Sequence, residues 1–335
     1  MDVVLQLTAI AEGRGREAAA QLRHPRQLET LREVAVIQSI DTSNAIEGIT
    51  APAARIAALA ADKTTPRNRS EQEIAGYRYA LAQIHDHAAD IPFEPRYVEQ
   101  IHGYVYRFTG ARHAGHFKTM DNAVTERRPD GTVVQRFVPV AAGRTPAAMD
   151  ELHLTFSRAA DSGTVPYPLL CAAYVLDFLT IHPFTDGNGR MARLITLWLL
   201  YQGGFGVGRY ISLERLIAAT KDDYYATLGA STTGWHENSH DVLPWTRYLL
   251  GILVAAYAEL DRELGIIGTS AVDRVVAIHR LVADWPNQEF RAAELHAALP
   301  GIKREALNTV LRRLREEGSL ERVGAGRGTR WRRVT

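Results

Sequence analysis

A polar, glycine-rich segment between two apolar runs is the feature that most constrains how this chain folds. Residues 182–193 read His-Pro-Phe-Thr-Asp-Gly-Asn-Gly-Arg-Met-Ala-Arg, and most residues at positions 169–181 before them and 194–201 after them are apolar. Runs of this kind predict a buried helix on each side of the segment. We therefore expect a short loop that is held between two core helices.

The first residues of this loop suit proton transfer next to an anion. Pro183 disfavours helical geometry for the residue before it, so the first helix should end at His182. The imidazole of His182 can take a proton from a hydroxyl near neutral pH. Gly187 and Gly189 permit positive φ and close backbone approach, and the next helix directs its unpaired amides toward the loop. These features predict an anion-binding nest.

The charged residues of the loop suit a bound polyphosphate. Asp186 lies beside the predicted nest, where a carboxylate oxygen could hold a magnesium ion that also touches phosphates. Arg190 and Arg193 are three residues apart on the second helix and therefore share a face. Two fixed cations on that face would neutralise phosphate charge.

The segment resembles the signature His-Pro-Phe-x-(Asp/Glu)-Gly-Asn-Gly-Arg-x-x-Arg of Fic-domain proteins and matches it at every fixed position. In that family the loop transfers a nucleoside monophosphate, usually AMP from ATP, to a protein hydroxyl. The resemblance implies that His182 is the general base and that Asp186 is the magnesium ligand. It also implies phosphate contacts by Gly187, Asn188, Gly189, Arg190 and Arg193.

A second resemblance lies upstream, after an amphipathic helical pattern that begins at residue 28. Ser43-Asn44-Ala45-Ile46-Glu47-Gly48 is similar to the inhibitory motif (Ser/Thr)-x-x-x-Glu-(Gly/Asn) of one class of Fic proteins. Ser43 and Glu47 are four apart, so a helical turn places them on one face. In the relatives this Glu binds the second signature arginine, here Arg193, and displaces the γ-phosphate. The alternative is a capped helix end with a solvated Glu47.

Residues 115–140 depart from the helical pattern. Pro129-Asp130-Gly131-Thr132 is turn chemistry between β-branched and aromatic residues, which predicts one hairpin. The hairpin falls where Fic proteins carry a flap that aligns the target segment by strand addition. Phe137, Val138 and Pro139 would be its docking residues, and a decorative hairpin is the alternative. Tyr224 lies where Fic relatives line the nucleotide base, although core packing would also explain it.

One further segment matches a metal-binding motif, but its surroundings predict a loop. Residues 236–240 read His-Glu-Asn-Ser-His and match a zinc-peptidase pattern that requires both histidines on one helix. Gly234 and Pro244 flank the segment, Asn and Ser are poor helix formers, and no third ligand is nearby. We therefore predict a polar loop.

Composition indicates a globular, cytoplasmic protein without a membrane partner. Hydrophobic residues make up 46% of the chain and charged residues 23%. The single cysteine, Cys171, lies in an apolar run, which favours a small core residue and a reducing compartment. The longest uncharged apolar stretch, residues 248–258, is far shorter than the roughly 20 residues that span a bilayer.

The net charge of +1 conceals a basic C-terminal region. Residues 270–335 hold 13 Lys and Arg against 8 Asp and Glu, while the preceding residues hold 26 against 30. Three helical patterns, a Pro300-Gly301 turn and a ribbon around Gly324-Ala325-Gly326 resemble a winged helix-turn-helix. Its basic surface suits phosphate contacts with DNA. A wing that docks a protein or forms a dimer is the alternative.

The sequence as a whole predicts an all-α, Fic-type helical core with a β-hairpin flap and a C-terminal winged helix-turn-helix domain. The expected parts are an N-terminal arm with the inhibitory helix (1–60), the catalytic core (61–264) and the winged-helix domain (270–335). The expected function is Mg²⁺- and ATP-dependent transfer of AMP to Tyr, Thr or Ser hydroxyls of a target protein and of the chain itself, autoinhibited by Glu47. Removal of AMP and a nucleotide-sensing, DNA-binding regulator are the alternatives, and a homodimer is left open.

Overall fold

The computed structural model describes residues 2–127, 132–265, 278, 281–282, 285, 288–298, 304–324 and 329–334. The chain forms two units, Met1–Leu260 and Asp261–Thr335. The three-part division expected from the sequence stays a prediction, and most of its linker lies outside the described residues.

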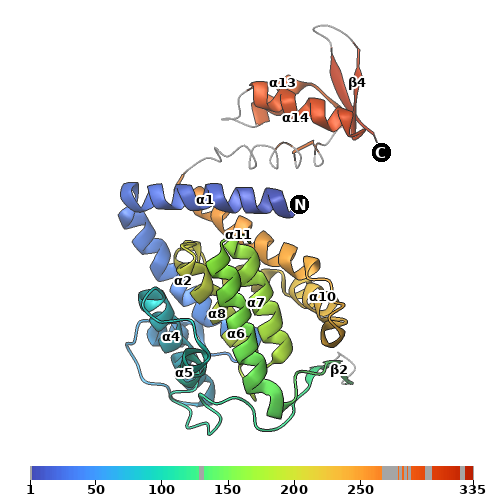
Figure 1. The fold of residues 1–335 in the computed structure, drawn as a ribbon. Coiled ribbons are helices and arrows are strands. Elements are labelled where there is room, and N and C mark those ends of the chain that lie inside the picture. The colour runs from blue at the N-terminus through green and yellow to red at the C-terminus, as the bar shows by residue number, and fades with distance from the viewer. Residues whose placement is uncertain are drawn as a thin grey trace. The chain divides into compact units, whose positions relative to one another are not determined.

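The first unit is a helical bundle with one hairpin (Figure 1). Helices α6, α7 and α8 run side by side, and α8 is buried on all sides from Arg190 to Tyr201. A helix that is apolar all round belongs in the centre of a core. The helices are α1 (Val3–Arg23), α2 (Pro25–Ile46), α3 (Ala53–Ala60), α4 (Arg69–His87), α5 (Pro95–Val105), α6 (Thr145–Ser162), α7 (Tyr167–Ile181), α8 (Asn188–Gln202), α9 (Leu213–Ala219), α10 (Lys221–Thr232) and α11 (Leu243–Glu263), with 3-10 turns η1 (Ala142–Arg144), η2 (Val207–Arg209) and η3 (Trp235–Glu237).

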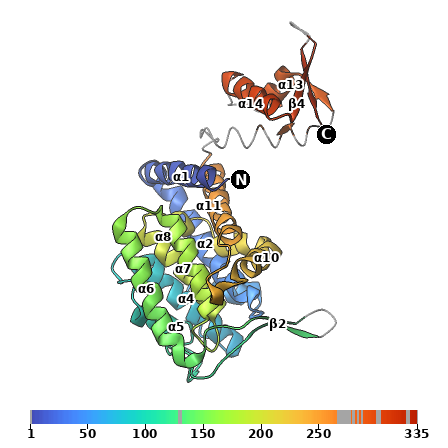
Figure 2. The ribbon, with the colours of Figure 1, turned by 45° about the vertical axis from the view of Figure 1, so that its right-hand side comes forward.

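Residues 3–23, for which the sequence predicts an arm with at most one short helix, form the 21-residue helix α1. Both ribbon views show α1 lying across one end of the bundle (Figures 1 and 2). Half of its buried residues are small, namely Ala9, Gly13 and Ala20. A Cβ at Gly13 would lie 2.4 Å from Cγ of Tyr257, so α1 packs closely on α11. Small residues give little periodic hydrophobic signal, which is why the sequence did not reveal this helix.

The hairpin consists of β1 (Val124–Arg127) and β2 (Val133–Phe137), which pair antiparallel. The register shifts between Val124 and Thr125, as at a β-bulge. The predicted Asp-Gly turn lies in residues 128–131, outside the described residues. Both views show the hairpin at the end of the bundle opposite α1 (Figures 1 and 2).

The second unit has its own hydrophobic core, which includes Phe290, Leu295, Leu311 and Leu320. Its described elements are β3 (Glu289–Phe290), α13 (Ala292–Ala298), α14 (Arg304–Glu316), β4 (Leu320–Val323) and β5 (Arg330–Arg333). The strands form an antiparallel sheet in the order β3-β5-β4. Most of the predicted first helix, residues 272–283, lies outside the described residues, so the winged-helix assignment stays a prediction. No helix in the described part of either unit is long and apolar enough to cross a bilayer.

The contact between α1 and α11 leads to a stability prediction. Replacing a helical glycine by alanine normally stabilises a helix by up to ~1 kcal/mol. At Gly13 the new methyl group would overlap the Tyr257 ring, and overpacking costs roughly 1–3 kcal/mol. We therefore expect Gly13→Ala to lower the free energy of unfolding. Gly15→Ala is the matched control, because nothing lies within 4 Å of its new Cβ, and it should be neutral or stabilising. Urea unfolding of both variants measures this, and equal stability would mean that α1 does not pack as described.

Candidate active site

The loop begins with a residue in an unusual backbone conformation. Helix α7 ends at Ile181, and His182 follows with φ 51° and ψ 60°, in the left-handed region. Its N–H donates to the carbonyl of Phe178 at 2.9 Å and so closes the helix. Residues other than glycine adopt this conformation uncommonly, and such residues cluster at active sites. The predicted helix end before Pro183 is therefore confirmed.

The imidazole of His182 is held as a neutral ring with one free nitrogen. Nδ1 lies 3.2 Å from the carbonyl oxygen of Leu179, and because a carbonyl only accepts, Nδ1 carries the proton. Burial lowers the pKa of His182 to about 4. Nε2 thus bears a lone pair at neutral pH, as a general base requires.

Two residues that the sequence analysis missed fasten this part of the loop. The backbone N–H of Lys118 donates to the carbonyl of Pro183 at 2.8 Å, and its Nζ lies 3.2 Å from the carbonyl of Ile181. Asn122 donates to the carbonyl of Phe184 at 3.1 Å. Burial lowers the pKa of Lys118 to about 8, so its ammonium still prevails at neutral pH. The carbonyls on either side of His182 are therefore fixed.

His102 on α5 fastens the other half of the loop and was also missed. Its Nδ1 accepts the N–H of Gly115 at 3.0 Å, so its Nε2 carries the proton and donates to the carbonyl of Asp186 at 3.1 Å. The ring stacks on Phe184 with 3.8 Å between centroids. Burial lowers the pKa of His102 to about 4, which keeps it neutral. Nothing in its sequence neighbourhood marks it, because its partners lie far along the chain.

Helix α8 begins directly at the loop and presents its first amides there. Gly187 is the N-cap, with φ 80°, and a Cβ on it would lie 2.9 Å from the Tyr106 hydroxyl. Asn188 closes the loop with its side chain, accepting from the N–H of Phe184 at 2.9 Å and donating to its carbonyl at 2.8 Å. The first amides of a helix have no partner within it and attract anions. The side chain of Asn188 thus shapes the nest.

Asp186 fits a magnesium ligand of the type that shares the ion with a substrate. It is exposed, and its Oδ1 accepts the N–H of Gly187 at 2.7 Å. Partial burial of the carboxyl group opposes its ionisation. The Tyr106 hydroxyl and the charge of Arg190 outweigh this effect and lower the pKa of Asp186. Among the described residues no group of three or more acidic, His or Cys side chains could hold a metal. One carboxylate together with substrate phosphates is a common arrangement for Mg²⁺.

The two signature arginines have different surroundings. Arg190 is 1% exposed, its NH1 lies 2.8 Å from a carboxylate oxygen of Glu73, and its NH2 donates to the Tyr106 hydroxyl at 2.7 Å. It therefore joins α8 to α4 and to the residue after α5. Arg193 is directed toward α2 instead. It donates from Nε to the Ser43 hydroxyl and from NH2 to the Ser43 carbonyl, both at 2.8 Å.

Glu47 completes the contacts of Arg193 across 146 residues of sequence. Its Oε1 accepts from NH2 of Arg193 at 2.7 Å. The same oxygen lies over the first turn of α8, where a Cβ on Gly189 would be only 2.3 Å from it. A glycine is thus required at position 189 so that Glu47 can approach α8 closely. Gly189 itself has a helical φ, and the positive φ that the sequence also allowed for it is not used. Glu47 lies where the sequence predicts phosphate.

The predicted docking and base residues lie in distinct environments. Phe137 stacks on the ring of His236, Val138 is 55% exposed and Pro139 is buried. Tyr224 is 5% exposed and packs edge-on against Trp245, within range of the charges of Arg193 and Glu47.

The His-Glu-x-x-His segment is a loop, as predicted. His236 lies in the 3-10 turn η3, and Asn238 then leaves helical geometry with φ 53°.

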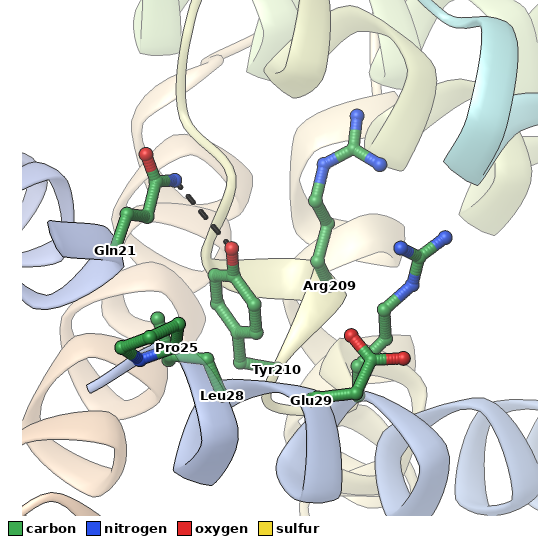
Figure 3. A pocket seen from close by; sticks show the side chains of 7 residues that line it. Gln21, Pro25, Leu28, Glu29, Arg209 and Tyr210 are labelled. Atoms are coloured by element: carbon green, nitrogen blue, oxygen red, sulfur yellow. Dashed lines mark hydrogen bonds between the residues drawn. The ribbon is translucent and has the colours of Figure 1, made fainter.

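A small cavity of about 180 Å³ lies elsewhere, where α1 meets α2. Figure 3 shows Gln21 directed at the Tyr210 hydroxyl, with Arg209 beside them. None of its lining residues belongs to the signature loop.

Residues 92–200 match the Fic/DOC family. The protein is similar to "Protein adenylyltransferase fic-1" of Caenorhabditis elegans, with 29% identity over 140 residues, which are 41% of this chain and 24% of that protein. The Caenorhabditis briggsae protein of the same name is 33% identical over 91 residues, 27% of this chain and 15% of that protein. The chain thus spans about a quarter or less of the length of these curated relatives.

Solved structures show the same fold at lower identity. A Fic family protein from Desulfovibrio desulfuricans G20 superposes with a TM-score of 0.63 at 23% identity, covering 99% of this chain and 95% of that one. A Fic domain containing signaling protein from Bacteroides thetaiotaomicron gives 0.62 at 20% identity, covering 78% and 97%. Residues 92–200, which match the family model, include the whole loop from His182 to Arg193. These residues therefore form a Fic-type domain, and the fold is all-α and Fic-type.

Proposed function

We propose that this protein transfers AMP from ATP to a hydroxyl group of a target protein. One observation carries the proposal: a neutral His182 with a free Nε2 lies on the same short loop as an ionised carboxylate and a helix N-terminus. Base, metal ligand and anion site are the groups that nucleotidyl transfer to an alcohol needs. The relatives named protein adenylyltransferase support the assignment.

In the proposed reaction the hydroxyl oxygen of the acceptor attacks the α-phosphorus of ATP. Nε2 of His182 takes the hydroxyl proton as the new bond forms. The bond from the α-phosphorus to the bridging oxygen breaks, and pyrophosphate leaves with its electron pair. The N-terminus of α8 stabilises negative charge on the phosphate oxygens. Magnesium held by Asp186 would supply further neutralisation of that charge.

Binding of the two substrates involves the hairpin and the tyrosine cluster. An acceptor segment that presents Tyr, Thr or Ser would add as a strand to the hairpin next to Phe137, Val138 and Pro139. A segment of this chain itself could serve as the acceptor. Tyr224 would bound the nucleotide base, since its ring lies within range of the charges of Arg193 and Glu47.

Glu47 would hold the enzyme in an inhibited state. Its carboxylate occupies the guanidinium of Arg193 and the space over Gly189, where the γ-phosphate would otherwise bind. Removal of AMP, with Glu47 orienting a water, uses the same residues. The two activities differ in product, since removal releases AMP from a modified protein and transfer labels an unmodified one.

A second function, DNA binding, is favoured by the charges of α14. Leu307, Leu311 and Leu314 face the core, which leaves Arg304, Asn308, Arg312 and Arg315 exposed on other faces. Within the described part of the chain these arginines have no ion-pair partner. Three of the nearby glutamates are already paired: Glu317 with Arg313, and both Glu289 and Glu321 with Arg332. Arg and Asn are suited to phosphate and base contacts.

The first functional prediction concerns the base. His182→Ala removes Nε2 and leaves the amides of α8 in place. Transfer of AMP should fall by roughly 10²- to 10⁴-fold, the usual loss for a general base, with ATP affinity little changed. Incorporation of labelled AMP and ATP binding are measured on the same preparation. Transfer near the wild-type rate would contradict the assignment of His182.

The second functional prediction concerns the inhibitory pair. Glu47→Gly frees Arg193 for the γ-phosphate and should raise AMP incorporation by roughly tenfold, which corresponds to ~1.4 kcal/mol of lost competition. Arg193→Ala in the same chain should cancel the gain.

Asp41→Ala is the control, because it removes an exposed carboxylate from α2 without placing a glycine inside the helix, and it should leave AMP incorporation unchanged. Equal incorporation by wild type and Glu47→Gly at equal ATP would refute the inhibitory role.

The DNA proposal predicts a difference between arginines on one helix. In the full chain, replacing Arg304 and Arg312 together by alanine should weaken binding to a DNA duplex. The slope of the logarithm of the binding constant against the logarithm of the salt concentration should become shallower by roughly one unit for each lost phosphate contact. Arg313→Ala, whose side chain is paired with Glu317, should change the slope little. Fluorescence anisotropy over a salt series measures both. A wild-type chain that binds no duplex at low salt would end this proposal.

A further inference from the structure

The 3-10 turn η3 links helix α7 to the hairpin. Nε1 of Trp235 donates to a carboxylate oxygen of Asp177 on α7 at 2.7 Å. The next residue, His236, has its Nε2 2.8 Å from the carbonyl oxygen of Val138. Because that oxygen can only accept, Nε2 is the donor. The His236 ring also stacks on Phe137, with 5.3 Å between centroids and 5° between planes.

This link connects the hairpin to the helix that carries the proposed base. Asp177 lies five residues before His182, which is roughly 7.5 Å along a helix at 1.5 Å per residue. The contacts therefore run from α7 through Trp235 and His236 to the end of β2. The bond to the hairpin uses a backbone carbonyl, so it fixes the position of the strand rather than one side chain. Nε2 of His236 is thus committed to the hydrogen bond with Val138.

The free edge of the hairpin lies next to this fixed point. β1 and β2 form a two-stranded sheet, so each has an edge without a strand partner among the described residues. Strand addition to such an edge uses main-chain hydrogen bonds for affinity, and side-chain contacts give selectivity. Val138 follows β2 directly and exposes 55% of its surface, whereas the ring of Phe137 is covered on one face by His236.

We propose that His236 is a positioning residue for the acceptor. It fixes the end of β2 so that an acceptor strand presents its hydroxyl to Nε2 of His182. The favoured acceptors are extended segments with a Tyr, Thr or Ser and an apolar neighbour that contacts Val138. This inference rests on the proposed AMP transfer and adds the residue that aligns the acceptor.

The test uses the full chain with Glu47→Gly, with and without His236→Ala. The acceptors are extended synthetic peptides, each with one Tyr, Thr or Ser between β-branched residues. We expect His236→Ala to raise the KM for the best peptide by roughly tenfold, the ratio equivalent to ~1.4 kcal/mol. The KM for ATP should stay unchanged, and so should the rate at which AMP is transferred from ATP to water, because neither needs the hairpin. His236→Gln, which keeps a side-chain N–H donor, should recover part of the loss.

Glu237→Ala is the matched control. It changes an exposed side chain in the same turn, for which the structure records no contact with the hairpin, and should leave the peptide KM unchanged. An unchanged peptide KM in His236→Ala, or an equal rise in the KM for ATP, would overturn the positioning role. The positioning role would also be overturned if Glu47→Gly transferred AMP from ATP to water but labelled no peptide. If AMP were transferred neither to water nor to a peptide, the proposed AMP transfer itself would be refuted.

Discussion

The guanidinium of Arg193 is the constraint on which the first unit depends. It is 3% exposed on a helix that is otherwise buried and largely apolar, and an unpaired buried charge costs several kcal/mol. Its hydrogen-bond acceptors come from α2, namely the hydroxyl and carbonyl of Ser43 and the carboxylate of Glu47. Helix α2 must therefore dock with its C-terminal turn over the N-terminal turn of α8. Gly189 makes the approach possible, because any side chain there would overlap the carboxylate of Glu47.

The loop between α7 and α8 is fixed in a comparable way, by donors to its carbonyls. Lys118 bonds the carbonyls of Ile181 and Pro183, and His102 bonds that of Asp186. His182 is thereby held in a left-handed conformation that a free chain would leave. The low pKa of the His102 ring matters here, because a neutral ring can accept from Gly115 and donate to the loop at once. Rigid support of this kind allows a short loop to hold the proposed base, the proposed metal ligand and the proposed anion site in one geometry.

The signature loop and the hairpin could be predicted from sequence because each depends on local features, and the all-α fold followed from helical periodicity together with the resemblance to Fic-domain proteins. Pro183 marked the end of α7, and the β-branched residues marked the hairpin. The supports of the loop could not be found in this way. His102, Lys118 and Glu73 contact it only in the folded chain, and each is an ordinary polar residue in its own segment. The full length of helix α1 was not predicted, because Gly13 and two alanines contribute to its packing face. These small residues allow close approach of another helix but give little hydrophobic periodicity.

The same contacts indicate that the proposed inhibition by Glu47 would be lost without loss of the fold. When Glu47 leaves, Arg193 keeps its bonds from Nε and NH2 to Ser43, so the guanidinium stays partnered in the core. The side chain of Glu47 is 32% exposed, and solvent screens its share of the ion pair, which limits that share to a modest free energy. A γ-phosphate carries more negative charge than one carboxylate and could take its place at the same cation. The proposed inhibition would therefore depend on competition between two anions for Arg193, while the position of α2 depends on Ser43.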